Sequence, residues 1–159
     1  MKHKRGFVLL LAVLVSGILL ALGLALYNIA SKELLLSSAG RDSQFAFYAA
    51  DSGIECALYW DAKEQAFSTT SSLESVTCGA GTVPSGGGVA PVTRTYDQGT
   101  QTYSTTFSFS LGSNIADPCT DVTVSRRYNP TRTSIRADGY NTCVTSDPKR
   151  SERATRSNS

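Results

Sequence analysis

The sequence predicts an α+β protein in which one long N-terminal helix packs on a small antiparallel sheet. Residues 7–27 form an almost uninterrupted apolar run, and no proline follows until Pro84. Farther along the chain, segments between residues 92 and 137 alternate between apolar and polar side chains with a period of two. The first pattern is typical of a long helix, and the second is typical of strands with one buried face.

The apolar run over residues 7–27 is predicted to span a membrane. Its only polar side chains are Ser16 and Tyr27. At about 1.5 Å per residue, a helix of this length reaches roughly 30 Å, the thickness of the hydrocarbon core of a bilayer. Setting the run aside leaves about 100 residues for a folded head, which is small for a single hydrophobic core.

The charges around this run predict its orientation. Lys2, Lys4 and Arg5 precede it, and with these three of the 15 basic residues set aside, 12 remain against 13 acidic residues. Cations on this side of the span hold the N-terminus in the cytoplasm. We therefore expect a single-pass inner-membrane protein with an extracytoplasmic head.

The second half of the helix, residues 28–61, is predicted to be amphipathic. Apolar side chains recur at helical spacing and are expected to cover the sheet: Phe47, Ala50, Ile54, Ala57 and Leu58. A set of small residues is expected to form contacts with other helices: Ala46, Ala49, Ala50 and Gly53. Asp51 and Glu55 lie four residues apart and are interpreted as a solvated surface, with an arginine of the head as a partner.

Residues 62–90 are predicted to be a loop or linker, because they are rich in serine, threonine and glycine. The head is predicted to span residues 91–148 and to contain about four strands: Val92–Tyr96, Tyr103–Leu111, Asp121–Arg127 and Thr133–Ala137. Asp97–Thr100 is the expected hairpin loop, and Tyr128–Pro130 is an expected turn. The polar residues 149–159 are predicted to be a disordered tail.

Four cysteines follow the apolar run, and an even count in a small exported domain predicts two disulfides. They are Cys56, Cys78, Cys119 and Cys143. Three pairings are compatible with the sequence. Disulfides between cysteines that are neighbours in the sequence would each stabilise the fold by about 3 kcal/mol. A zinc site is disfavoured because the sequence contains no CxxC pair.

Four arginines concentrate positive charge on the last two predicted strands: Arg126, Arg127, Arg132 and Arg136. One interpretation is a nucleic-acid contact through phosphates. The other is a solvated face that is partly paired with the acidic second half of the helix. The sequence favours the second interpretation, since Asp121, Asp138 and Asp147 dilute the basic patch and no aromatic residues are clearly interleaved with it.

The sequence does not predict an enzyme. The only histidine is His3, close to the N-terminus, and no phosphate-binding loop, dinucleotide fingerprint or EF-hand spacing is present. Asp117 and Asp121 are too few carboxylates to predict a calcium site. No cofactor and no metal are expected.

The N-terminal part of the chain resembles a known family. Lys4-Arg5-Gly6-Phe7 followed by an apolar helix is similar to the type IV pilin and pseudopilin superfamily. The pattern of Glu33, then Arg41-Asp42, then residues 46–53 (AFYAADSG) is closest to PilX-type minor pilins. This resemblance covers residues 4–60. It implies a pilin-like fold, a leader over residues 1–6, cleavage between Gly6 and Phe7 by a prepilin peptidase, and N-methylation of Phe7.

One position departs from the pattern of major pilins. Their fifth mature residue is glutamate, whereas that position here is Leu11. The resemblance therefore implies a minor subunit, at the tip or in initiation, of a type IV pilus or of a filament like that of type II secretion. Its expected partners are the membrane, the prepilin peptidase and other pilin subunits, and its final location is an extracellular filament.

Two other fates of the N-terminal segment remain open. Gly23-Leu24-Ala25 offers a site for signal peptidase, which would remove the apolar helix. A plain signal anchor would keep the helix and also the residues before it. In that case the protein is a membrane-anchored extracytoplasmic module that binds a ligand or DNA and does not assemble.

Overall fold

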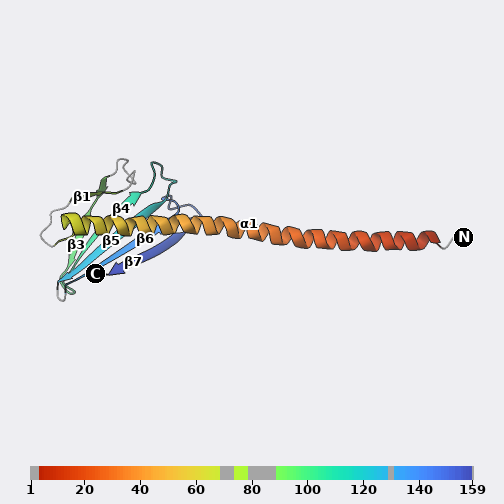
Figure 1. The fold of residues 1–159 in the computed structure, drawn as a ribbon, viewed down its shortest axis with the longest axis horizontal. Helices are drawn as coiled ribbons and strands as arrows, with labels where there is room; N and C mark the ends of the chain where they lie inside the picture. Colours follow the sequence, from red (N-terminus) through yellow and green to blue (C-terminus); the bar gives the residue numbers. More distant parts are fainter. Residues whose placement is uncertain (1–3, 69–73, 79–88, 129–130, 159) are drawn as a thin grey trace. The chain divides into compact units, whose positions relative to one another are not determined.

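The computed structural model describes residues 4–68, 74–78, 89–128 and 131–158. Within these ranges the chain forms one helix and seven strands: α1 (Lys4–Glu64), β1 (Ser75–Thr77), β2 (Val89–Pro91), β3 (Thr93–Asp97), β4 (Thr102–Ser110), β5 (Cys119–Tyr128), β6 (Thr131–Tyr140) and β7 (Glu152–Asn158). The chain divides into two compact units, Met1–Ala39 and Gly40–Ser159. The predicted α+β arrangement, with a long apolar helix and an antiparallel sheet, is confirmed (Figure 1).

The main sheet is an antiparallel meander in the order β3-β4-β5-β6-β7. All four predicted strands are present, and the predicted hairpin loop joins β3 to β4. Asp97 shapes this loop, because its carboxylate accepts hydrogen bonds from the Thr100 hydroxyl at 2.8 Å and from the Gly99 amide at 2.9 Å. These bonds lower the pKa of Asp97. The turn expected at Tyr128–Pro130 falls partly on residues 129–130, outside the described ranges.

The prediction of a disordered tail over residues 149–159 is wrong. Residues 152–158 form β7, which pairs along β6 from Tyr140↔Glu152 to Ser134↔Asn158. A polar strand is suited to a sheet edge, where backbone hydrogen bonds supply the pairing and charged side chains discourage further pairing. The approach to β7 is fixed by the Arg150 guanidinium, which lies 3.7 Å from the centre of the Tyr140 ring.

The segment predicted to be a loop, residues 62–90, contains more regular structure than expected. β1 and β2 pair in a small antiparallel sheet of two strands. Val76 on β1 is fully buried, and the indole of Trp60 donates a hydrogen bond of 3.2 Å to the Thr77 carbonyl. This contact holds the short strand against the end of α1.

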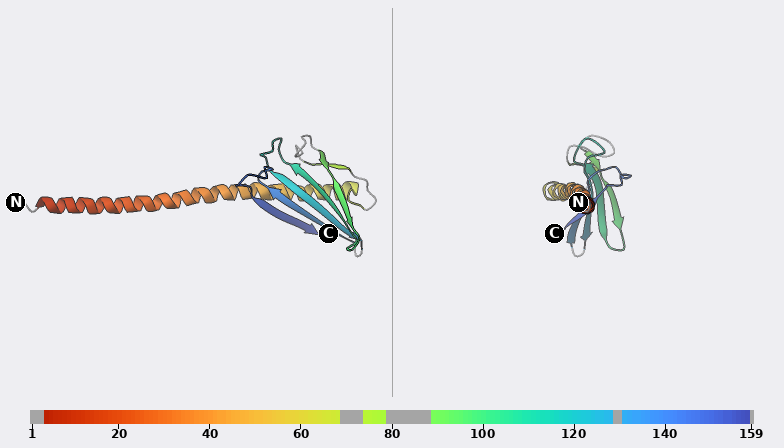
Figure 2. Two further views of the ribbon diagram at one scale, coloured as in Figure 1. Left: turned by 180° about the vertical axis from the view of Figure 1, so that it is seen from behind. Right: turned by 90° about the vertical axis from the view of Figure 1, so that its right-hand side faces the viewer.

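The C-terminal part of α1 lies on one face of the main sheet. Seen from behind, the strands lie in front of α1, and no helix of the described residues covers their other face (Figure 2). The helical stripe predicted to cover the sheet is correct for three of its five residues; the other two, Phe47 and Leu58, are 50% and 40% exposed. The helical side chains that are buried are mostly small: Ala46, Ala49, Ala50, Gly53, Ile54 and Ala57.

These small residues were expected to contact other helices, and the structure corrects that prediction. They let α1 approach the sheet so closely that larger side chains would not fit. A Cβ atom on Gly53 would lie 2.7 Å from the Thr120 hydroxyl, and one on Gly139 would collide with backbone atoms of Ala46 and Ala50. Glycine and alanine therefore define where the helix sits on the sheet.

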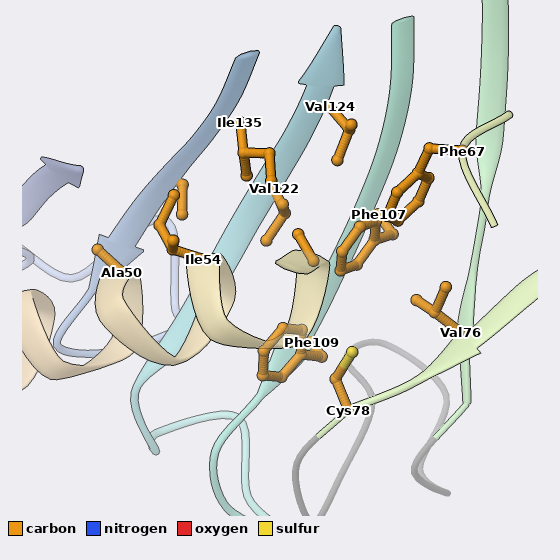
Figure 3. Close-up of a cluster of buried hydrophobic side chains, with 12 residues drawn as sticks. Ala50, Ile54, Phe67, Val76, Cys78, Phe107, Phe109, Val122, Val124 and Ile135 are labelled. Carbon is orange, nitrogen blue, oxygen red and sulfur yellow. The ribbon is translucent and has the colours of Figure 1, made fainter. Parts of the chain in front are cut away.

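The hydrophobic core fills the space between α1 and the strands (Figure 3). Alternate residues of β4 and β5 point into it, as the period of two predicted, and Phe107, Phe109 and Val122 are at most 3% exposed. Phe67, just after the end of α1, stacks on Phe107 with ring centres 6.0 Å apart. The chain thus folds back from the helix directly onto the sheet.

Candidate functional site

The N-terminal unit presents an apolar helical surface. In α1, the large apolar side chains between Phe7 and Leu36 are 46% to 77% exposed. By its length and composition, α1 is able to cross a membrane. Gly6 lies within the first turns of this helix, and Phe7 is 70% exposed.

The second surface of interest is the outer face of the sheet, meaning the face of β3–β7 opposite to α1. Strand pairing sets its side chains in rows. One row consists of Asp97, Thr102, Arg127 and Arg132, and the next consists of Thr95, Ser104, Ser125, Ser134 and Asn158. The third row contains Thr93, Thr106, Thr123, Arg136 and Arg156. We call the part of these three rows that lies on β5–β7 the basic half of the outer face.

The four arginines singled out in the sequence do not act as one group. Arg126 shares the inner face with Val122 and Val124, and it forms an ion pair of 3.3 Å with Asp61 on α1. Pairing of the head with the acidic part of the helix is thus correct for this arginine. Arg127, Arg132 and Arg136 lie on the outer face, where Arg156 joins them.

The separation of Arg126 from Arg127 follows from strand geometry, in which successive side chains point to opposite faces. The parity of Val122 and Val124 was a signal that could have identified it in the sequence. Arg156 could not be found in this way, since its strand was predicted to be disordered.

Like charges stand directly opposite one another in the basic half. Arg127 pairs with Arg132 across β5 and β6, and Arg136 pairs with Arg156 across β6 and β7. Such pairs destabilise a sheet by a few tenths of a kcal/mol up to about 1 kcal/mol each. Arg136 is partly compensated by Asp138, which lies 2.9 Å away on the same strand.

The opposite end of the outer face is acidic. Asp121 and Asp138 face each other across β5 and β6, and Glu152 on β7 is paired with Tyr140. Burial, followed by the negative charges of Asp121 and Glu152, raises the pKa of Tyr140. The outer face is therefore divided into a basic half and an acidic half.

The cysteines agree with the prediction of two disulfides only in part. Cys56 on α1 and Cys78, just after β1, form a disulfide with their Cα atoms 6.0 Å apart. The other two are buried thiols rather than a second bond. The Cys143 thiol donates a hydrogen bond of 3.2 Å to the Asp117 carbonyl, and Cys143 neighbours Cys119. Neither of these two sulfurs forms a disulfide in the structure.

We expect the Cys119 thiol of the folded chain to react slowly. Burial, together with the neighbouring Cys143, raises its pKa well above the ordinary value, so little thiolate forms near neutral pH. Iodoacetamide at pH 8, followed by mass measurement, should label Cys119 only after denaturation. Rapid labelling of the native chain would contradict this expectation.

The raised pKa of Cys119 also predicts how the stability of the head changes with pH. A thiol whose pKa is higher in the folded chain than in the unfolded chain contributes fully to the free energy of unfolding below its unfolded pKa. This contribution is lost as the pH rises above the unfolded pKa, which is about 8.5. The free energy of unfolding should therefore fall above about pH 8.5. A Cys119→Ala variant should lose this part of the pH dependence.

The part of the chain that the structure describes contains no group of three or more His, Cys, Asp or Glu residues that could hold a metal ion. Comparison with protein-family models, curated proteins and solved structures finds no match to this chain. Its function is therefore argued from the two surfaces above.

Proposed function

We propose that this chain is a minor pilin or pseudopilin. In this proposal it is a structural subunit, at the tip or in initiation, of a type IV pilus or of a filament like that of type II secretion. A prepilin peptidase cleaves between Gly6 and Phe7 and methylates Phe7. The subunit first resides in the inner membrane with its head outside the cytoplasm, and it then enters the filament.

One observation carries the proposal: the exposed large apolar side chains of α1, from Phe7 to Leu36, follow directly after a short basic segment that ends in Gly6. Such a surface needs lipid or other apolar helices around it. Lipid supplies these contacts before assembly, and the helices of other subunits supply them afterwards. The fifth mature position, Leu11, carries no carboxylate, which supports a role in a subunit present at a few copies.

The experiment is to express the full chain with and without a prepilin peptidase and to determine its mass and N-terminal residue. We expect a mature chain that begins with N-methylated Phe7 only when the peptidase is present. Gly6→Val should block cleavage, because a side chain is introduced at the scissile bond. Gly17→Val is the matched control, since no neighbouring atom lies within 4 Å of a Cβ there, and it should be cleaved normally.

A second function is favoured by the uncovered, charged outer face of the sheet. In that case the chain is a membrane-anchored binding module that never assembles. An uncleaved N-terminus in the presence of the peptidase would support this function and contradict the first. A chain that begins after Ala25 would contradict both, since the membrane helix would be lost.

A further inference from the structure

A small hollow lies beside two facing arginines on the outer face of the sheet. Arg136 on β6 is paired with Arg156 on β7, and both residues line a hollow of about 160 Å³. The other lining residues are Ala154 and Thr155, also on β7. Ala154 carries only a methyl group, so the space next to Arg156 stays open. All the charge that lines this hollow is therefore positive.

The two arginines are compensated to different degrees. Asp138 holds Arg136, whose Nε donates hydrogen bonds of 2.9 Å and 3.1 Å to the two carboxylate oxygens, and whose Nη2 lies 2.9 Å from Oδ1. This arrangement leaves Nη1 of Arg136 for another acceptor, and the Arg136 side chain is 50% exposed. Among the described residues, the exposed Arg156 forms no ion pair. The hollow thus keeps a net positive charge, and one of its two arginines is already fixed in position.

Sheet stability does not account for this pair of arginines. Like charges directly opposite one another destabilise a sheet. The next pair on the same strands, Ser134 and Asn158, maintains the backbone pairing of β6 with β7 without any charge. An anion held by both guanidinium groups would replace their repulsion by attraction to one shared ligand.

We propose that the hollow between Arg136 and Arg156, which we call the two-arginine site, binds a phosphomonoester group. Such a group carries about 1.5 to 2 negative charges near neutral pH and has three terminal oxygens. Three oxygens accept hydrogen bonds from two guanidinium groups at once, and arginine matches phosphate with parallel hydrogen bonds. Because Asp138 already holds Arg136, binding orders fewer side chains and costs less entropy.

The surroundings of the two-arginine site favour a single compact anion. On one side along the strands, Asp121 and Asp138 face each other and repel a polyanion that continues in that direction. On the other side, the adjacent row on β6 and β7 is uncharged. A carboxylate has only two oxygens, which suit one arginine rather than two, and Arg136 already has such a partner. A phosphodiester offers one terminal oxygen and one charge fewer than a phosphomonoester.

The test titrates methyl phosphate into the full chain, which is held in a neutral detergent without phosphorus, and follows the ligand by phosphorus NMR. The parent chain should bind methyl phosphate about tenfold more tightly than dimethyl phosphate. Arg156→Gln should weaken the binding of methyl phosphate by about tenfold or more, because hydrogen bonds between charged groups are lost. Equal binding of the two phosphates by the parent chain would overturn the proposal.

Ala154→Leu tests the hollow itself without changing any charge. The larger side chain fills the space beside Arg156, so methyl phosphate should bind about as weakly as it does to the Arg156→Gln chain. Ala154 is exposed on the edge strand, and the Ala154→Leu chain should therefore unfold at the same temperature as the parent chain. A folded Ala154→Leu chain that binds like the parent chain would contradict the assignment to this hollow.

Arg127→Gln is the matched control. Arg127 also lies on the outer face and also faces an arginine, Arg132. It is four residues along β5 from Thr123, which belongs to the row of Arg136, and this corresponds to about 13 Å. At physiological ionic strength the screening length is about 8 Å, so binding should change less than about twofold. Equal weakening by Arg127→Gln and Arg156→Gln would reduce the effect to general attraction by a basic surface and overturn the proposal.

A phosphomonoester group occurs both in soluble phosphate esters and in lipid headgroups, and two probes distinguish these sources. Glucose phosphate tests the first source, and dihexanoyl phosphatidic acid in the same detergent tests the second. Dihexanoyl phosphatidylglycerol, a phosphodiester, is the control for the lipid. Binding of either monoester that Arg156→Gln weakens supports the proposal and identifies the source. If neither ester binds, the proposal is wrong.

Competition decides between phosphate and carboxylate. Malonate at the same concentration as methyl phosphate should displace little of it, because a carboxylate serves only one of the two arginines. Complete displacement by malonate would overturn the assignment to a phosphomonoester. The inference does not rest on the proposed function, since N-terminal cleavage and phosphate binding are measured separately and either can fail alone.

Discussion

Replacing Gly139 with alanine is expected to lower the free energy of unfolding of the head by about 3 kcal/mol. The added Cβ would collide with the Ala46 carbonyl oxygen and the Ala50 amide nitrogen, which belong to the backbone of α1. A backbone cannot move aside as a flexible side chain can, so the helix must shift away from the sheet. Chemical unfolding of the detergent-solubilised chain, followed by circular dichroism, measures this loss.

Gly40→Ala provides the control. Gly40 lies on α1, and no neighbouring atom lies within 4 Å of a Cβ at this position. Alanine favours a helix over glycine by up to about 1 kcal/mol, so this variant should be as stable as the parent chain or slightly more stable. If both variants had the same stability, the close contact between β6 and α1 would not be the constraint we describe.

The local elements could be predicted because their patterns are local. Residues from Tyr103 to Leu111 alternate with a period of two, and β4 buries Thr105, Phe107 and Phe109 as that pattern requires. The helix was likewise predicted to end near Asp61 and ends at Glu64. In these segments, hydrophobic periodicity and the absence of proline determine the structure without information from distant residues.

The face that α1 buries could not be predicted from hydrophobicity. A larger apolar side chain gains more from burial, which favoured Phe47 and Leu58 as contacts with the sheet. The structure instead selects Ala46 and Gly53, because Gly139 and Thr120 on the facing strands leave room only for small groups. That selection depends on the complementary shape of two distant segments, which a single helical pattern does not contain.

β7 was missed for a related reason. Its sequence between Glu152 and Asn158 has a single apolar residue, Ala154, so no hydrophobic pattern marks it as a strand. Its stability comes from backbone pairing with β6 and from contacts such as the one between Arg153 and Ser43. Because Arg156 lies on this strand, the same omission hid one quarter of the basic half's arginines from sequence analysis.

Predicting the arrangement of arginines on the outer face would have required both the strands and their register. The sequence shows four arginines close together, but only the pairing of Arg127 with Arg132 and of Arg136 with Arg156 shows that like charges face each other. The register also removes Arg126 from the group and pairs it with Asp61. The structure therefore shows how these charges are arranged, and the binding of a partner would account for the facing arginines.

Loss of the disulfide between Cys56 and Cys78 is the second change expected to have a large effect. The bond closes a loop with a sequence separation of 22 residues, and removing such a link is expected to cost about 3 kcal/mol through the unfolded state. The double variant Cys56→Ala, Cys78→Ala should therefore unfold at a lower denaturant concentration. Trp60, the only tryptophan, reports the change, because its indole donates to the Thr77 carbonyl beside Cys78.

The matched control is Cys119→Ala, Cys143→Ala, which removes two buried sulfurs that carry no cross-link in the structure. A reducing agent separates the two effects. Reduction should destabilise this control and the parent chain by the same amount, and it should leave the Cys56→Ala, Cys78→Ala chain unchanged. If reduction destabilised that chain as well, a second disulfide would have to join Cys119 and Cys143, and the description of both as buried free thiols would be wrong.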